Sequence, residues 1–151
     1  MLLWLQQHAG IPVDDLAKAL EHGSGLRALA GTTDMREVLS AAADGEPSAT
    51  LAVEVYLRSL RAGIAAMTAA MGGLDVLVFT GGVGEHAAVV RSAAAERLGY
   101  LGVHVDAGRN GEAESDAEVS EAGAFVRTLV VTAREDLEIA GGARKVFTDH
   151  E

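Results

Sequence analysis

The chain has 151 residues, of which 49% are hydrophobic and none is cysteine, and its formal net charge is −10. A chain of this length can bury one core, which predicts a single domain over residues 1–151. Without cysteine, a disulfide framework and a thiolate metal site are excluded. The acidic charge argues against nucleic acid and against an anionic membrane surface as partners, because both attract clustered Lys and Arg.

No apolar segment approaches the length of a membrane span, and the apolar start at residues 1–5 is too short for a signal peptide. We therefore expect a soluble, cytoplasmic protein. The five histidines lie far apart in the sequence. This spacing does not indicate a structural zinc site.

Helical periodicity dominates the first half of the chain. The pattern predicts two short helices over residues 2–8 and 13–21, and it leaves the apolar run at 26–30 open between helix and strand. The longest helical pattern covers residues 46–71 and ends at a pair of glycines. Apolar residues recur along it at spacings of three and four, which predicts one core stripe, with continuation into a subunit interface as a further expectation. The stripe consists of Val53, Leu57, Leu60, Ile64, Met67 and Met71.

A further helix is predicted over residues 35–43. Asp34 precedes it and Glu37 follows three residues later, which is the spacing of a capping box. Taken alone, these residues are explained by a helix cap at Asp34 and a solvated charge at Arg36.

The segment from residue 75 to residue 98 carries the most informative pattern. Val76–Phe79 is an unbroken apolar run, which predicts a strand covered on both faces. Three glycines follow within residues 81–84, and their missing side chains let a ligand approach the backbone. From Glu85 the pattern becomes helical, with Val90, Ala94 and Leu98 on one face. Free N–H groups at such a helix start suit a phosphate-bearing ligand, although a plain tight turn uses the same glycines.

Two more strands are predicted, over residues 100–106 and 125–132, so that together with residues 75–80 three strands lie among helices. Residues 107–123 between them are acidic and rich in Gly and Ser, which predicts an exposed loop or an irregular hairpin. A last helix is expected from residue 133 to residue 147.

The glycine segment also satisfies the dinucleotide fingerprint, as Gly82-x-Gly84-x-x-Ala87, and Asp106 ends the next apolar run at the expected distance. A Rossmann unit opens with this strand, whereas a long helical stretch precedes it here. The later strands do not supply a second βαβ half. A Rossmann-type dinucleotide-binding domain is therefore the weaker alternative.

Three motifs point to another family: Thr33-Asp-Met-Arg-Glu37, Phe79-Thr-Gly-Gly-Val-Gly-Glu85 and Glu135-Asp-Leu-Glu-Ile-Ala140. In this order they resemble the C-terminal domain of acetate kinases, in the acetate/propionate kinase branch of the actin-like ATPases. The resemblance covers essentially the whole chain. It implies an α/β fold: the C-terminal part of an actin-like, RNase H-like ATPase domain, with a mixed sheet flanked by helices. The sheet is expected to be incomplete and to have an exposed edge.

The resemblance also implies an ATP or ADP site with Mg²⁺. The residues that would contact the nucleotide are Asp34, Met35, Arg36, Gly82, Val83, Gly84, Glu85 and His86. The first three would border the adenosine, and the other five would enclose the nucleotide from the other side. Glu135 matches the acidic residue that the family uses at the magnesium, which is a hard oxygen ligand. His86 stands where the family has Asn.

The implied activity is that of an acetate kinase, which converts ATP and acetate to ADP and acetyl phosphate. In that family the acetate pocket and the residues that handle the transferred phosphate lie in a first domain with no counterpart here. We therefore expect no catalytic residue within 1–151 and an inactive isolated chain. The alternative is a truncated nucleotide-binding or dimerisation module. The expected partners are the nucleotide and either a second copy, forming a homodimer, or a separate N-terminal half.

Overall fold

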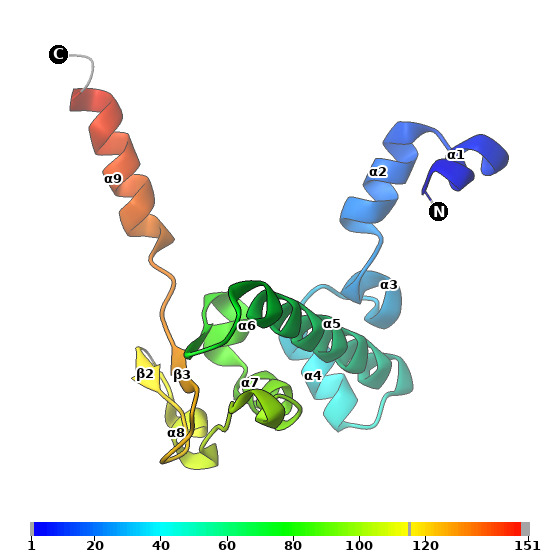
Figure 1. Cartoon of the computed structure of the whole chain (residues 1–151). Coiled ribbons are helices and arrows are strands. Elements are labelled where there is room, and N and C mark those ends of the chain that lie inside the picture. The colour runs from blue at the N-terminus through cyan, green and yellow to red at the C-terminus, as the bar shows by residue number, and fades with distance from the viewer. Residues whose placement is uncertain (1, 115, 149–151) are drawn as a thin grey trace. The chain divides into compact units, whose positions relative to one another are not determined.

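The computed structural model describes residues 2–114 and 116–148 (Figure 1). The chain divides into two compact units, residues 1–63 and 64–151, which we describe one at a time. The assignment of residues 1–151 to a single domain stays a prediction. Within the described ranges, no helix is both long and apolar enough to cross a membrane.

The first unit is helical, as its periodicity predicts. Its elements are α1 (Leu2–Ala9), α2 (Val13–His22), α3 (Leu26–Ala30), α4 (Met35–Ala43) and most of α5 (Pro47–Met71). The ambiguous residues 26–30 are therefore helical. The apolar side chains of α1 and α2 are largely exposed, and the buried ones belong to α4 and α5: Met35, Val38, Ala49, Ala52 and Leu57.

The stripe predicted along α5 is buried over only part of the helix. Leu57 is 7% exposed, whereas Met67 and Met71 are 59% and 65% exposed. The apolar positions repeat every seven residues, and a straight helix drifts by about 20° per heptad. The two methionines therefore rotate away from the buried side, where Thr68 lies instead. The stripe is therefore not core within this chain at this end of the helix, and its continuation into a subunit interface stays a prediction.

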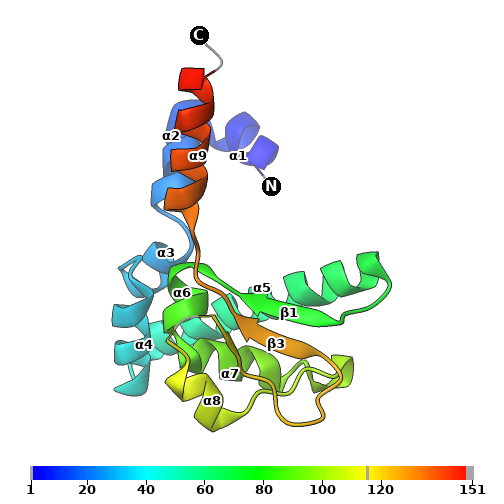
Figure 2. The same ribbon diagram turned by 90° about the vertical axis from the view of Figure 1, so that its left-hand side faces the viewer.

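The second unit is built on a small open sheet with strand order β1–β3–β2. β1 (Val76–Phe79) pairs in parallel with β3 (Arg127–Val130), and β2 (Ala117–Glu118) pairs antiparallel with β3. Figure 2 shows β1 and β3 side by side. The other elements of this unit are α6 (Gly81–His86), α7 (Ala88–Glu96), η1 (Gly99–Leu101), α8 (Ala107–Glu112) and α9 (Glu135–Thr148), together with the end of α5. The predicted mixed sheet among helices is confirmed.

One face of this sheet is buried and the other is not. Leu77 is paired with Thr128, Phe79 is paired with Val130, and all four are buried. On the opposite face of β1, Val76 and Val78 are 41% and 46% exposed. The prediction of a strand covered on both faces is therefore wrong, because the helices of this unit leave one face uncovered. Among the described strands β1 pairs only with β3, so the expected open edge is present.

Residues 100–106 do not form the predicted strand. The 3₁₀ turn η1 comes first, Gly102 has a φ of +88°, and only two single bridges remain, Val103 to Val126 and Val105 to Ser120. A β-carbon on Gly102 would come within 2.9 Å of the β-carbon of Phe125. The left-handed turn at Gly102 interrupts the extended backbone that a strand requires.

The described residues 107–114 and 116–123 contain both α8 and β2, so they hold more regular secondary structure than the predicted loop or irregular hairpin. Asp106 caps α8, because its Oδ1 accepts a hydrogen bond of 2.8 Å from the backbone N of Arg109. Asn110 on this helix is only 2% exposed. A segment whose composition is typical of loops thus contains a short capped helix.

Thr128 offers a test of packing in the sheet. Its Oγ1 is buried with no hydrogen-bond partner among the described residues, although its backbone N donates to Ser120 Oγ at 2.7 Å. An unsatisfied buried hydroxyl costs about 1–3 kcal/mol. We expect Thr128→Val to raise the free energy of unfolding by about 1 kcal/mol in urea denaturation. Ser120→Ala should lower it, and a Thr128→Val midpoint at or below that of the wild type would contradict this account.

Candidate functional site

The glycine-rich segment after β1 is helical from its first glycine. Thr80 is extended, and α6 then runs from Gly81 to His86. Ala87 separates it from α7, which begins at Ala88. The prediction of a helix that starts only at Glu85 is therefore wrong, because the glycines themselves form the first turn. The predicted apolar positions Val90, Ala94 and Leu98 are all buried, but α7 ends at Glu96, so Leu98 lies beyond the helix on which it was expected.

The three glycines of α6 are subject to different constraints. Gly81 has a φ of +71°, a conformation that side chains disfavour. A β-carbon on Gly84 would lie 3.2 Å from the carbonyl carbon of Phe79, so Gly84 permits close packing of the helix on the strand. Gly82 is exposed, and a β-carbon there would meet nothing within 4 Å. The fold itself therefore does not require glycine at position 82.

The carboxylate of Glu85 fastens α6 to another part of the second unit. Its Oε1 accepts hydrogen bonds of 2.8 Å from the backbone N of Gly81 and from the backbone N of Ala133. A negative charge at a helix N-terminus is favourable. The N–H group of Gly81 is thus already satisfied within the chain, contrary to the expectation that the N–H groups at this helix start are free for a phosphate.

A buried guanidinium holds the other end of α6. Arg91 is 1% exposed, and its Nη1 donates to Gly84 O at 2.9 Å and to Glu85 O at 2.6 Å. Its Nε and Nη2 donate to Asn110 Oδ1 at 2.6 Å and to Asn110 O at 2.7 Å. Burial lowers the pKa of Arg91. An arginine guanidinium nevertheless stays protonated in proteins.

Neither Arg91 nor Asn110 is among the site residues expected from the sequence. One signal was available for Arg91, since it is the only charged residue in the run 87–95, which otherwise contains Ala, Val and Ser. A lone charge in the buried part of a helix needs partners from elsewhere in the fold. For Asn110, 19 residues further on, no comparable signal exists.

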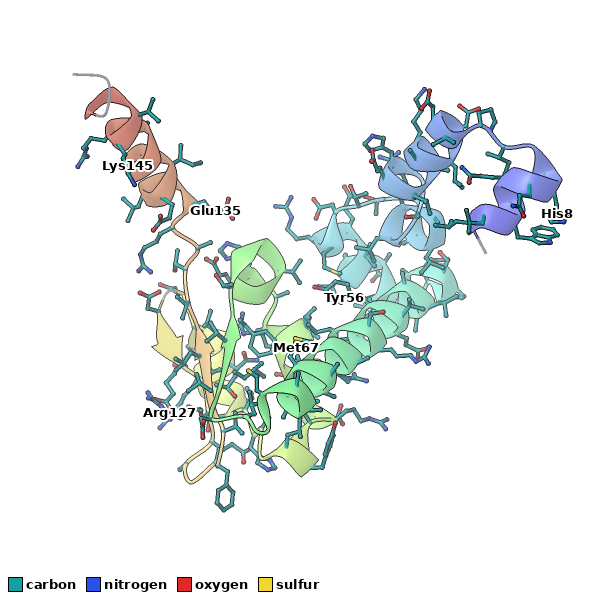
Figure 3. The ribbon with its side chains drawn as sticks, turned by 45° about the horizontal axis from the view of Figure 1, so that its top comes forward. His8, Tyr56, Met67, Arg127, Glu135 and Lys145 are labelled. Atoms are coloured by element: carbon teal, nitrogen blue, oxygen red, sulfur yellow. The ribbon has the colours of Figure 1, made fainter. Side chains whose placement is uncertain are left out.

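Glu135 is the first residue of α9, where the chain leaves β3 (Figure 3). The segment before it is held in place by Glu85, through Ala133 N, and by Asp116. The carboxylate of Asp116 accepts a hydrogen bond of 2.9 Å from Thr132 N and is paired with the Arg134 guanidinium. The hydrogen bond from Arg134 is the main reason that the pKa of Asp116 is lowered.

A shallow depression lies at the start of α9. Its lining residues are Ala133, Arg134, Glu135, Glu138 and Ile139. No group of three or more His, Cys, Asp or Glu that could hold a metal ion occurs in ranges 2–114 and 116–148. Mg²⁺ is often bound by one or two carboxylates together with waters and substrate phosphates. Glu135 therefore fits a Mg²⁺ that arrives with a nucleotide, and it does not fit a metal cage built by the protein alone.

Asp34, Met35 and Arg36 lie at the start of α4 in the first unit. Asp34 is confirmed as a helix cap, because its Oδ1 accepts from Arg36 N at 2.9 Å. Its carboxylate also receives the Arg36 guanidinium, with Nη2 2.6 Å from Oδ2. In a full capping box the Glu37 side chain would accept a hydrogen bond from the backbone N of Asp34. Here that backbone N donates to Thr32 Oγ1 instead, so only the Asp34 half of the capping box is formed. Met35 is only 6% exposed, whereas the Arg36 side chain is 88% exposed.

The structure thus brings some of the predicted site residues together. Residues 82–86 and Glu135 belong to the second unit and are linked through the bond from Ala133 to Glu85. Residues 34–36 belong to the first unit.

The capping pair at α4 gives a pH test. Hydrogen bonds from Arg36 lower the pKa of Asp34 from 3.8 to about 2. Because the folded pKa is depressed, the stabilisation is fully present above about pH 4 and is lost as the pH falls toward 2. We expect the free energy of unfolding to fall less over this range in Asp34→Asn than in the wild type, in urea denaturations at several pH values. Parallel pH profiles for the two proteins would contradict this.

The open mixed sheet, the glycine helix directly after β1 and the acidic start of α9 are those of the C-terminal part of an actin-like ATPase domain. The family model of the acetokinase family matches residues 1–141, and the chain belongs to that family. It is 43% identical over 141 residues to an acetate kinase of Gloeobacter violaceus, a match that covers 93% of this chain and 35% of that protein.

Solved structures give the same assignment. The crystal structure of Porphyromonas gingivalis acetate kinase matches with a TM-score of 0.86 at 30% identity, over 97% of this chain and 37% of that one. A propionate kinase from Francisella tularensis matches with a TM-score of 0.82 at 32% identity, over 92% of this chain and 35% of that one. The chain therefore spans little more than a third of the length of these relatives.

Proposed function

We propose that this chain forms the adenosine side of the ATP site of an acetate kinase-like phosphotransferase. The observation that carries the proposal is the way in which α6 exposes Gly82 and is bonded to the segment before Glu135. Gly82 is exposed and not required by the fold, and the helix that bears it is fastened to the segment that presents Glu135. Membership of the acetokinase family supports the reaction, in which ATP and acetate give ADP and acetyl phosphate.

The proposed nucleotide contacts are Asp34, Met35, Arg36, Gly82, Val83, Gly84, Glu85 and His86, and Glu135 is the proposed ligand of Mg²⁺. Burial of the Met35 side chain leaves its backbone as the contacting part. The Glu85 carboxylate is engaged by two backbone N–H groups, so its side chain is proposed to shape the site. His86 is exposed and is available to a ligand.

When bound, Mg²⁺ supplies positive charge that neutralises the nucleotide phosphates. The role of this chain's own residues is to orient the nucleotide and to hold Glu135 in place. We propose no catalytic residue within 1–151. The groups that contact the transferred phosphoryl and the acceptor acid are proposed to lie in the part of the relatives' length that this chain does not span.

The open edge of β1 and the exposed Val76 and Val78 suit a covering partner, since an unpaired strand edge favours pairing. We propose that a second copy or a separate N-terminal half fills this role in the cytoplasm. A compact monomer in light scattering at high concentration would argue against the second copy.

A truncated, inactive nucleotide-binding or dimerisation module is the second candidate, favoured by the open edge of β1 and the exposed Val76 and Val78. Translating the DNA upstream of the first codon discriminates between the two candidates. An N-terminal half in frame or nearby supports the enzyme, and its absence supports the module.

For purified residues 1–151 we expect no acetyl phosphate in a hydroxamate assay with ATP, Mg²⁺ and acetate. ADP binding in calorimetry should be at least tenfold weaker than for a full-length acetate kinase assayed alongside, because half a cleft buries less ligand and is poorly preorganised. Acetyl phosphate formation at a rate comparable to that of the full-length enzyme would contradict the assignment of catalysis to residues outside this chain.

A further inference from the structure

We infer that Arg91 is a positioning residue for α6 and for the segment that presents Glu135, although it is too deeply buried to contact a ligand. The inference rests on the proposed function, because it names a residue that orients the same site. It is carried by the hydrogen bonds that connect Arg91 directly to α6 and, through the Glu85 carboxylate, to Ala133 near Glu135.

The partners of Arg91 are unusual for a buried cation. Its four recorded hydrogen bonds go to neutral oxygens: Gly84 O, Glu85 O, Asn110 O and Asn110 Oδ1. A helix leaves its last carbonyl groups without partners and carries partial negative charge there. The planar guanidinium satisfies two such carbonyls of α6 at once, which a lysine ammonium does less well.

Asn110 fixes the direction of this guanidinium. Its Nδ2 donates to Ala88 O at 2.8 Å and to Ser92 Oγ at 2.7 Å, which leaves Oδ1 to accept from Arg91. Asn110 belongs to α8, which lies against α7. The guanidinium is thus held by α8 and holds α6.

Glu85 connects Arg91 to the segment before α9. Arg91 holds its carbonyl oxygen, while its carboxylate holds Gly81 N at the start of α6 and Ala133 N near the start of α9. Ala133 lies two residues before Glu135. One buried cation therefore fixes the glycine helix at its last turn and, through Glu85, the approach to the proposed magnesium ligand.

Amide hydrogen exchange of the complete chain 1–151 tests this without any ligand. In Arg91→Lys we expect the amides of Gly81 and Ala133 to exchange at least tenfold faster relative to the amide of Val131, which bonds to Phe79 O in the sheet. Leu98→Ala is the matched control, because Leu98 is 1% exposed and is not among the recorded partners of Arg91. It should speed exchange at Val131 and leave Gly81 and Ala133 near their wild-type rates.

A second variant covers the case in which Arg91→Lys does not fold. Asn110→Ala keeps the cation and its two bonds to α6 but removes the oxygen that orients it, so a smaller increase at the same two amides is expected. The inference is overturned if Gly81 and Ala133 respond to the Arg91 or Asn110 variants no more than to Leu98→Ala.

Calorimetric titration with ADP separates this inference from the proposed function. If the wild type binds no ADP, the proposal that residues 82–86 contact nucleotide in the isolated chain fails, and the exchange measurement decides the role of Arg91 by itself. If the wild type binds ADP, we expect at least tenfold weaker binding in Arg91→Lys than in Leu98→Ala. Equal ADP affinity in these two variants would overturn the positioning role.

Discussion

Replacing Gly82 by Val is expected to weaken ADP binding at least tenfold, about 1.4 kcal/mol. The free energy of unfolding should stay within about 0.5 kcal/mol of the wild type. Gly82 is exposed, lacks a positive φ, and has open space where a β-carbon would be. A valine there meets no protein atom near its β-carbon, so its bulk acts against a ligand that approaches the backbone. Calorimetric ADP titration and urea denaturation of the same samples measure both effects.

Gly84→Val is the contrasting variant. Its β-carbon would lie 3.2 Å from the backbone of Phe79, which cannot move without shifting β1. Overpacking of this kind costs about 1–3 kcal/mol. We therefore expect Gly84→Val to lose stability and ADP binding together, whereas Gly82→Val loses binding alone. ADP binding that survives in the double variant Gly82→Val/Gly84→Val would show that this helix is not the nucleotide site.

The sequence contained the local features of the fold. Periodicity and caps located the helices of the first unit except α3, and the apolar run at residues 76–79 located β1, because these patterns need only neighbouring residues. The strand expected over 100–106 failed for a non-local reason. The backbone turns at Gly102, where a side chain would collide with Phe125. Phe125 follows the acidic segment 107–123 in the sequence. Nothing in residues 100–106 alone specifies that contact.

In the candidate site, too, the local features were predictable from the sequence and the non-local contacts were not. The glycines of α6 and the acidic start of α9 were found from their motifs, whose residues are adjacent in the chain. The bonds that connect them were not, because Glu85 and Ala133 are 48 positions apart and Arg91 and Asn110 are 19 positions apart. Motifs thus located the surfaces proposed to meet the nucleotide, whereas the buried side chains that orient them required the structure.

Arg91→Leu is expected to lower the free energy of unfolding by about 3–5 kcal/mol, because several buried acceptors lose their donor; this is a large part of the roughly 5–15 kcal/mol typical of a domain. The leucine is apolar and supplies no donor, so the carbonyl oxygens of Gly84, Glu85 and Asn110 lose these hydrogen bonds in a buried region. Each buried acceptor left unsatisfied costs about 1–3 kcal/mol.

The matched control is Arg127→Leu, the same substitution at an arginine whose side chain is 61% exposed and is paired with Glu118. Because exposed ion pairs contribute little to stability, Arg127→Leu should lower the free energy of unfolding much less than Arg91→Leu does. Urea denaturation with a common slope measures both variants. If Arg91→Leu lost no more free energy of unfolding than Arg127→Leu, the four hydrogen bonds that Arg91 donates would contribute no more than one surface ion pair. That result would mean that the buried guanidinium does not hold α6 in place.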